Sequence, residues 1–267
     1  MSHDIYEFLT VTSADGVGWI EYNRPPINTF NHAMLHEMRA ALDTLIADDA
    51  TRVVVIASAL EKHFSAGAEL QLFDGIGREG MRDWAEYCHG IVRVLRGSPK
   101  PFLAAIHGLA VGGGLEMTFH CDLRFAADTA RIGSPEIALN YMPPIAGTQA
   151  LARLMGRSKA LDYLFRGELI SAAEAEAAGL VDFVCSPDKL RDEVGAYAAM
   201  LATKPPEALA AIRRCVIEGG AKSFDEGLAI ELEHVSDLAG TRNFEEGVRA
   251  FLERRAPVWR WTADTET

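Results

Sequence analysis

Residues 102–116 read FLAAIHGLAVGGGLE, and this stretch decides how the chain folds. Its first part, Phe102–Ile106, is a continuous apolar run of the length expected for a strand buried on both faces. Three consecutive glycines, Gly112–Gly114, then precede a largely apolar helix. Glycine is entropically costly at a helix start, so a run of glycines is favoured where the backbone must approach another group closely. The stretch therefore predicts a buried strand, a tight turn able to hold a ligand, and a helix.

A second unit of the same kind lies earlier in the chain. Arg52–Ala57 (RVVVIA) is another short, apolar and β-branched run, and His63–Leu70 (HFSAGAEL) then leads into a helix through small residues. The first turn of a helix leaves backbone N–H groups without intrahelical partners, and it carries a partial positive charge. Two such turns in consecutive units therefore predict one site where backbone amides stabilise negative charge.

The rest of the chain alternates strands with helices and then continues with helices alone. An N-terminal hairpin is expected over Ile5–Ser13 and Val17–Tyr22, and Leu180–Val184 is the last strand expected. This order is typical of an α/β core with an appended helical region, and we assign these to residues 1–195 and 196–267. The other expected elements are the strands Leu123–Ala126 and Ala130–Gly133 and the helices His32–Ile46, Arg78–Arg96, Gly114–Cys121, Thr148–Gly156, Ser158–Phe165, Ser171–Gly179, Lys189–Ala202, Pro206–Gly219, Ser223–Ala239 and Asn243–Arg254.

The amino-acid composition argues against two classes of binding partner and against a metal site. The 267 residues include 38 acidic and 26 basic side chains, which give a net charge of −12. An acidic chain is poorly suited to nucleic acid or to anionic membranes, so neither is expected as a partner. The four cysteines are scattered without zinc-type spacing, so no metal site is expected and the thiols suggest a reducing compartment. With no signal peptide or membrane span in the sequence, we expect a cytoplasmic protein.

Two glutamates follow the glycine turn. Glu116 stands two residues after Gly114, and Glu136 lies 136 − 116 = 20 positions further on, after a Gly-Ser-Pro break. Each has a plain structural interpretation: Glu116 suits the start of a helix, and Glu136 could face solvent from a loop. If the fold instead brings both carboxylates beside the amide site, they form a workable acid/base pair.

Five motifs occur in an order that covers nearly the whole chain. They are YNRP…NTFN at 22–31, FSAGAEL at 64–70, IHGLAVGGGLE at 106–116, SAAEAEAAGLV at 171–181 and EG…AFLERRAP at 246–257. In these motifs the sequence resembles the crotonase superfamily, most closely its enoyl-CoA hydratase/isomerase branch. The resemblance implies the crotonase (ClpP-like) fold, a spiral of repeated ββα units with a C-terminal helical region that builds trimers, often paired as hexamers.

The resemblance also implies a substrate and a set of site residues. The substrate would be an acyl-coenzyme A thioester, with coenzyme A as part of the substrate and no other cofactor. The amides of Ala68 and Gly113 would form the oxyanion hole, and Glu116 and Glu136 would be the catalytic pair. The remaining implied residues are Asn28, Ala66, Leu70, Gln71 and Gly112 for substrate and coenzyme A binding, and Trp84, Tyr87 and Tyr141 for the acyl pocket.

Having both glutamates favours an enoyl-CoA hydratase, which adds water across the double bond of a 2-enoyl-CoA on one face. Residues 143–149 read PPIAGTQ, whereas hydratases of the family usually read PGAGGTQ. Pro144 thus replaces a glycine whose backbone N–H is thought to help place the water, and proline has no N–H. This departure leaves open an enoyl-CoA isomerase, or a hydrolase or C–C lyase acting on a branched or cyclic acyl-CoA. A non-catalytic scaffold or an RNA-binding homologue is a further alternative; the latter would favour a lysine-rich helix, whereas His32–Ile46 has Arg39 as its sole Lys or Arg.

Overall fold

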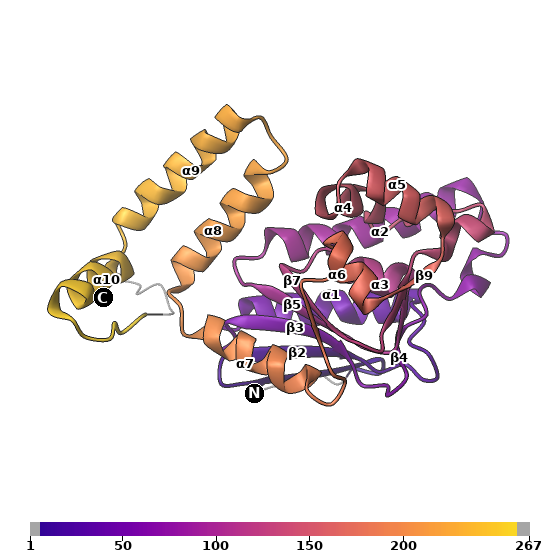
Figure 1. Ribbon diagram of the computed structural model, residues 1–267, viewed down its shortest axis with the longest axis horizontal. Helices are drawn as coiled ribbons and strands as arrows, with labels where there is room; N and C mark the ends of the chain where they lie inside the picture. The colour runs from indigo at the N-terminus through magenta and orange to yellow at the C-terminus, as the bar shows by residue number, and fades with distance from the viewer. Residues whose placement is uncertain (1–5, 261–267) are drawn as a thin grey trace.

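A computed structural model describes residues 6–260 of the chain (Figure 1). Its larger sheet has six strands in the order β1-β2-β3-β5-β7-β10. The β1–β2 hairpin is antiparallel, and every other neighbouring pair in this sheet is parallel. These strands are β1 (Leu9–Ala14), β2 (Val17–Tyr22), β3 (Val53–Ser58), β5 (Phe102–Ile106), β7 (Leu123–Ala127) and β10 (Phe183–Cys185).

A smaller sheet of four short strands, in the order β4-β6-β8-β9, lies at the end of the larger one. Each of β3, β5 and β7 is followed by a strand of this second sheet, and an α-helix then follows directly in one of the three units and after a 3-10 helix in the other two. The chain therefore winds as a spiral of ββα units, as the family resemblance implies, whereas the residues alone predicted a turn in place of the second strand in the first two units. The four strands are β4 (His63–Ser65), β6 (Leu109–Val111), β8 (Arg131–Gly133) and β9 (Leu169–Ser171).

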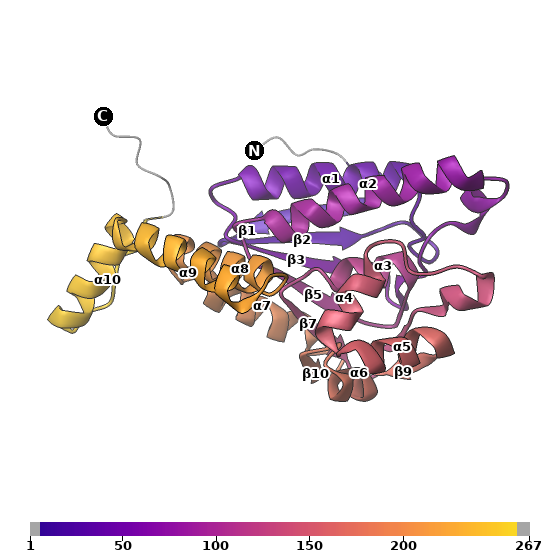
Figure 2. The ribbon, with the colours of Figure 1, turned by 90° about the horizontal axis from the view of Figure 1, so that it is seen from above.

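The larger sheet is buried on both faces because its strands present apolar residues on both sides. On β3, Val54 and Ile56 pack into one hydrophobic cluster, while Val53 and Val55 pack into another. Helices α1 and α2 cover the first face, and α7 covers the second (Figure 2). The helices and 3-10 helices of this core are α1 (His32–Ala47), η1 (Leu70–Phe73), α2 (Gly77–Gly97), α3 (Gly112–Thr118), η2 (Pro135–Leu139), α4 (Gly147–Leu154), α5 (Arg157–Arg166), α6 (Ala172–Ala178) and α7 (Leu190–Ala202).

Three further helices form an arm that extends away from the sheets (Figure 1): α8 (Pro206–Gly219), α9 (Phe224–Ala239) and α10 (Arg242–Glu253). Buried Arg213 joins the arm to the core, because its guanidinium pairs with Asp122 at 2.8 Å and donates to the carbonyl oxygens of Leu95, Arg96 and Ser98. The boundary predicted at residue 196 falls inside α7, which packs on the sheet, and this division of the chain stays a prediction.

Several predicted elements are displaced by two or more residues. The helix expected over Gly114–Cys121 spans Gly112–Thr118. Its first turn packs so tightly on β4 that a Cβ at Gly114 would lie 2.1 Å from the side chain of Ser65. The strand expected over Leu180–Val184 begins at Phe183, because the Leu180 amide donates to Ala175 and closes α6 instead. The first predicted strand, Ile5–Ser13, is observed over Leu9–Ala14, and Ile5 lies outside the described residues. Within residues 6–260, no helix combines the length and the apolar character required to cross a membrane.

Candidate functional site

The two glycine turns meet at a backbone-to-backbone contact. A Cβ built on Gly112 would lie 3.1 Å from the Cα of Gly67, and one built on Gly67 would lie 3.3 Å from the Cα of Gly112. Both residues have positive φ angles, +55° and +83°, which disfavour a side chain as well. Because these glycines touch, the residues that follow them, Ala68 and Gly113, are brought to one site.

A cavity of about 120 Å³ opens at this contact. Both turns, η2, the loop before α4 and the aromatic end of α2 contribute to its wall. We call it the central cavity, and its lining residues are Phe30, Ala66, Gly67, Ala68, Leu70, Phe73, Trp84, Val111, Gly112, Gly113, Pro135, Glu136, Leu139, Tyr141, Pro144 and Ile145.

Glu116 is completely buried, and it lies in the second turn of α3 and not at the start of the helix, where its sequence position suggested. Its Oε2 accepts hydrogen bonds from the backbone N–H groups of Ile145, at 2.8 Å, and Gly147, at 3.0 Å. Its Oε1 is buried and has no hydrogen-bond partner among the described residues. Burial and the charge of Glu136 raise the pKa of Glu116 well above its ordinary value, and the two amides act in the opposite direction. The carboxyl group is thus held by one oxygen and keeps the other free.

Glu136 lies on η2, not on an exposed loop, and its residue is only 7% exposed. Burial raises the pKa of its carboxyl. Its Oε2 has no hydrogen-bond partner in the described part of the chain, and its Oε1 lies 3.3 Å from where a Cβ on Gly112 would be. Glu136 lines the central cavity. Glu116 does not belong to the lining that the described residues form, but the charge of Glu136 acts on its carboxyl group.

The two carboxyl groups are suited to opposite roles in proton transfer. Burial disfavours the charged form of both carboxyl groups, and the charge of Glu136 disfavours the ionisation of Glu116 further. One member can then act as an acid while the other acts as a base. Each also keeps one buried oxygen without a protein partner, which leaves an acceptor available to a reacting molecule.

The loop that holds Glu116 runs over 143–147 and differs from the family motif at Pro144. Pro144 lines the central cavity and has no N–H to offer it. Its carbonyl oxygen lies 2.8 Å from Nε2 of His89, and the carbonyl oxygen of Ile145 lies 2.8 Å from Nε2 of His120. Ile145 is buried at the same wall, where its Cδ1 would be 2.8 Å from a Cβ on Gly113. Sequence reasoning missed both histidines; the available signal was the spacing of His120, four residues after Glu116.

The residues expected to bind substrate divide into two groups. Ala66, Leu70, Gly112, Trp84 and Tyr141 line the central cavity, together with the oxyanion-hole candidates Ala68 and Gly113.

The other group is absent from the cavity lining that the described residues form. Asn28 is buried behind the turns, where its Nδ2 donates to Tyr22, Ser58 and Phe64. Gln71 is exposed on η1. Tyr87 faces away toward α1, where its hydroxyl lies 2.8 Å from Nδ1 of His36. Asn28 therefore braces the loops, and Tyr87 packs between helices.

Three aromatic side chains lie together in the lining of the central cavity. The ring of Phe73 lies 5.5 Å from the ring of Trp84 and 5.6 Å from that of Tyr141, measured between centroids. The Tyr141 hydroxyl donates to the Met81 sulfur at 3.1 Å. Phe73 was not predicted, because η1 is too short to show periodicity. Elsewhere, residues 6–260 contain no group of three or more His, Cys, Asp or Glu side chains able to hold a metal ion.

Known proteins resemble the chain over nearly its full length. The enoyl-CoA hydratase/isomerase family matches residues 12–262. A probable enoyl-CoA hydratase of Rhizobium meliloti (strain 1021) is 36% identical over 252 residues, which cover 94% of this chain and 96% of that protein. The crotonyl-CoA hydratase of Syntrophomonas wolfei subsp. wolfei is 31% identical over 94% of this chain and 96% of that protein. The crystal structure of an enoyl-CoA hydratase from Bacillus anthracis superposes with a TM-score of 0.91 at 32% identity, over 96% of this chain and 100% of that one.

The buried carboxyl groups predict a measurable pH dependence of stability. A carboxyl whose pKa is raised in the folded state binds more protons folded than unfolded, so its contribution to stability falls as pH rises from its ordinary pKa through the raised one. We expect the loss of Tm between about pH 5 and pH 8 to be smaller in Glu116→Gln than in the wild type. Differential scanning calorimetry measures both slopes. Glu86→Gln, on the exposed surface of α2, should keep the wild-type slope, and parallel curves for Glu116→Gln and the wild type would contradict the burial of an ionisable group.

Proposed function

Because the chain belongs to the enoyl-CoA hydratase/isomerase family, we propose that it is an enoyl-CoA hydratase, which adds water to the double bond of a 2-enoyl-CoA and catalyses the reverse dehydration. The observation that carries the proposal is the pair of buried glutamates, each with one oxygen that lacks a protein partner. A water molecule held between two such oxygens would be oriented and activated. The relatives named enoyl-CoA and crotonyl-CoA hydratase support the same reaction.

The reaction follows from the roles of four residues. The thioester carbonyl accepts hydrogen bonds from the amides of Ala68 and Gly113, which stabilise the enolate oxygen that forms; such a donor contributes about 2.7–4 kcal/mol. Glu116 and Glu136 hold the water for attack at Cβ, and a water proton passes to the carboxyl pair as the oxygen adds. Glu136 supplies the proton to Cα, so the pair ends with the number of protons it began with, and both additions occur on the face of the substrate turned to the carboxyl groups. Coenzyme A enters as part of the substrate, and these steps use no other cofactor.

Pro144 removes one hydrogen-bond donor from the water and leaves the two carboxyl groups as its partners. The family pattern has a glycine there, whose N–H is available to the water, whereas this chain presents a proline ring at the same wall. The Ile145 and Gly147 amides are already engaged with Glu116. In this protein the water is therefore positioned by the two carboxyl groups.

Replacing either glutamate should abolish turnover while leaving the fold intact. We expect Glu116→Gln and Glu136→Gln each to lower kcat for a four-carbon 2-enoyl-CoA by about 10²- to 10⁴-fold, because each removes one proton-transfer partner. The loss of the absorbance of the conjugated thioester measures the rate, and uptake of labelled oxygen from water identifies hydration.

The exposed variant Glu86→Gln is the control and should retain the wild-type rate. Wild-type rates in Glu136→Gln would refute its role as the acid. An isomerase would move the double bond without taking up labelled oxygen, and a hydrolase or C–C lyase would release free coenzyme A or a cleaved product instead. Each of these results would replace hydration by the corresponding alternative.

We further propose that the substrate carries a short acyl chain. The central cavity is small, about 120 Å³, and Phe73, Trp84 and Tyr141 stand together at its aromatic end. A longer chain would have to displace these rings, and Trp84 is nearly completely buried. The aromatic group thus limits the length of the acyl chain.

Removing one ring should relax that limit. We expect Tyr141→Ala to raise the kcat/KM ratio of a ten-carbon to a four-carbon 2-enoyl-CoA by about 10-fold or more, because pocket changes of this size alter discrimination by about 1–3 kcal/mol. Steady-state kinetics with both substrates measure the ratio. Tyr87→Ala is the matched control, since Tyr87 belongs to α2 like Trp84 but contacts His36. An unchanged ratio in Tyr141→Ala would show that another group limits the chain.

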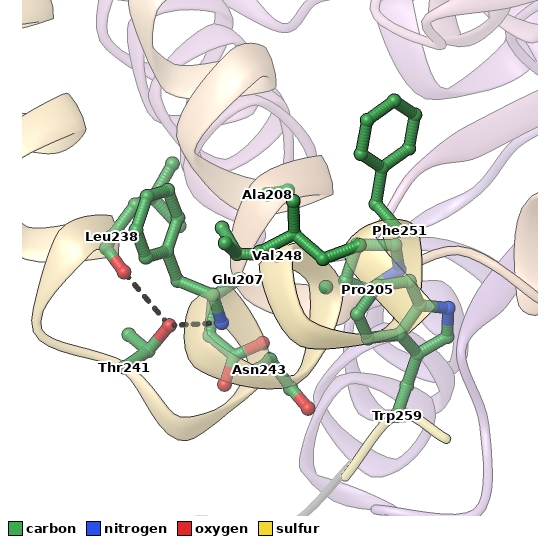
Figure 3. Close-up of a pocket in the computed structure, with 12 residues that line it drawn as sticks. Pro205, Glu207, Ala208, Leu238, Thr241, Asn243, Val248, Phe251 and Trp259 are labelled. Carbon is green, nitrogen blue, oxygen red and sulfur yellow. Dashed lines mark hydrogen bonds between the residues drawn. The ribbon is translucent and has the colours of Figure 1, made fainter. Parts of the chain in front are cut away.

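The helical arm supports a third proposal, that the protein is a homotrimer, alone or paired as a hexamer. The arm holds a groove of about 400 Å³ between the start of α8, the end of α9 and α10 (Figure 3). Phe251, on its rim, is 83% exposed. A large exposed apolar surface is typical of a subunit interface. The exposed apolar residues of the arm are Ile212, Val216, Phe224, Leu228, Leu232, Val235, Phe244, Val248, Phe251 and Leu252.

A charge at the groove should weaken this association. We expect sedimentation equilibrium of the wild type to give a multiple of three times the 29.1 kDa chain, and Phe251→Glu to shift the distribution toward smaller species because a buried carboxylate opposes assembly. Phe251→Leu keeps the side chain apolar and should behave as the wild type. A monomeric wild type at micromolar concentration would refute the trimer.

A further inference from the structure

Two histidines from different parts of the core hold consecutive carbonyl groups of one loop. His89, in the second half of α2, places its Nε2 2.8 Å from the Pro144 carbonyl oxygen. His120, just after α3, places its Nε2 2.8 Å from the Ile145 carbonyl oxygen. A carbonyl oxygen can only accept, so each Nε2 carries the hydrogen and donates it. No role in the reaction has so far been given to either side chain.

The loop transmits the effect of His89 to Glu116 through a single peptide unit. The carbonyl of Pro144 and the N–H of Ile145 belong to the same planar peptide group, where a trans bond directs them to opposite sides. His89 binds the first, and Glu116 Oε2 accepts from the second at 2.8 Å. Fixing the carbonyl therefore fixes the direction of the N–H. If the His89 bond is lost, this peptide group can rotate, and the hydrogen bond to Glu116 is lost with it.

His120 restrains the next peptide group, whose N–H belongs to Ala146 and which links the two residues, Ile145 and Gly147, whose amides bind Glu116. It follows Glu116 by four residues, about one helical turn, so both side chains reach the same loop. His120 is 5% exposed, and burial lowers its pKa to about 4. Its Nδ1 is buried with no hydrogen-bond partner among the described residues, as suits the unprotonated nitrogen of a neutral imidazole. His120 is thus a neutral donor, and it restrains the loop without adding a charge beside the carboxyl pair.

We propose that His89 and His120 are positioning residues for the reaction, which hold the loop over 143–147 so that its amides fix the carboxyl group of Glu116. The proposal rests on the proposed function, because it assigns a catalytic consequence to Glu116. Neither histidine lines the central cavity as the described residues define it, so both act through the loop. Since Pro144 offers no N–H to the water, the orientation of Glu116 carries more of the catalytic effect.

The variants His89→Ala and His120→Ala remove one donor each. We expect kcat to fall about 10- to 100-fold with KM changed by less than about twofold, because the substrate contacts stay in place while Glu116 is misoriented. The two amides lower the pKa of Glu116, so weakening them raises it, and the acid limb of the kcat/KM profile should move to higher pH. His89→Gln and His120→Gln keep an N–H near the position of Nε2, and each should recover most of the activity.

His107 provides a matched control. Its Nε2 lies 2.6 Å from the Leu60 carbonyl oxygen, so His107→Ala removes the same kind of bond from a different loop. It should leave the pH profile in place. Equal profile shifts in His107→Ala and His89→Ala would overturn the proposal, as would glutamine variants no better than the alanine ones. Circular dichroism confirms that each variant folds.

A second measurement separates this proposal from the proposed function. Infrared titration of Glu136→Gln follows the carboxylic-acid band of Glu116 without any substrate. That band is assigned to Glu116 by its absence from the double variant Glu116→Gln/Glu136→Gln. Adding His89→Ala or His120→Ala should move its midpoint to higher pH. An unmoved midpoint overturns the positioning role even if the enzyme hydrates 2-enoyl-CoA. A wild type that hydrates no 2-enoyl-CoA refutes the proposed function, while the infrared midpoint still decides the role of the histidines.

Discussion

The close approach of Gly67 and Gly112 is the constraint on which the rest of the site depends. Two strand-to-helix turns that are 45 positions apart touch through backbone alone, with built Cβ atoms only 3.1 and 3.3 Å from the opposing Cα atoms. The contact sets the spacing of the Ala68 and Gly113 amides, which no side chain has to position. It is possible because β4 and β6 are neighbours in the smaller sheet. The spiral arrangement of the strands therefore also brings the two candidate oxyanion-hole amides together.

The two carboxyl groups are positioned differently from the two amides. Both glutamates are buried, and each lies on a short helix. α3 and η2 are too short to be stable alone, so tertiary contacts fix them. For Glu116 these contacts are the amides of Ile145 and Gly147, and the loop that carries them is held in turn by His89 and His120. The position of Glu116 thus depends on a chain of hydrogen bonds that runs from His89 on α2 through the loop over 143–147.

Local features of the sequence (apolar runs, consecutive glycines, and acidic residues at breaks) predicted the alternation of strands and helices, both glycine turns and both glutamates. The ββα order was implied only by the family resemblance, because β4 and β6 are three residues long and their segments were expected as turns. The sequence could not predict that Tyr87 turns toward His36 while Trp84, three residues earlier, lines the cavity, since both lie on one helix and only packing decides which face is inward. His89 and Phe73 were missed for a related reason. Their partners lie about 55 and 68 positions away in the chain, and single-sequence periodicity carries no information at that range.

The turn between η1 and α2 has a consequence for how such an enzyme can diversify. Gly75 and Gly77 have open space around them, with no atom within 4 Å of a built Cβ, whereas Gly67, Gly112 and Gly114 are surrounded by backbone or by Ser65. This turn joins Phe73 to the helix that carries Met81 and Trp84, which together form the aromatic end of the cavity. The positive φ angles of Gly75 and Gly77, +68° and +63°, still favour glycine at these two positions. Added residues in this turn would nevertheless meet open space, whereas between the two glycine turns they would meet backbone. Substrate range can drift within such a lineage while the chemistry stays the same.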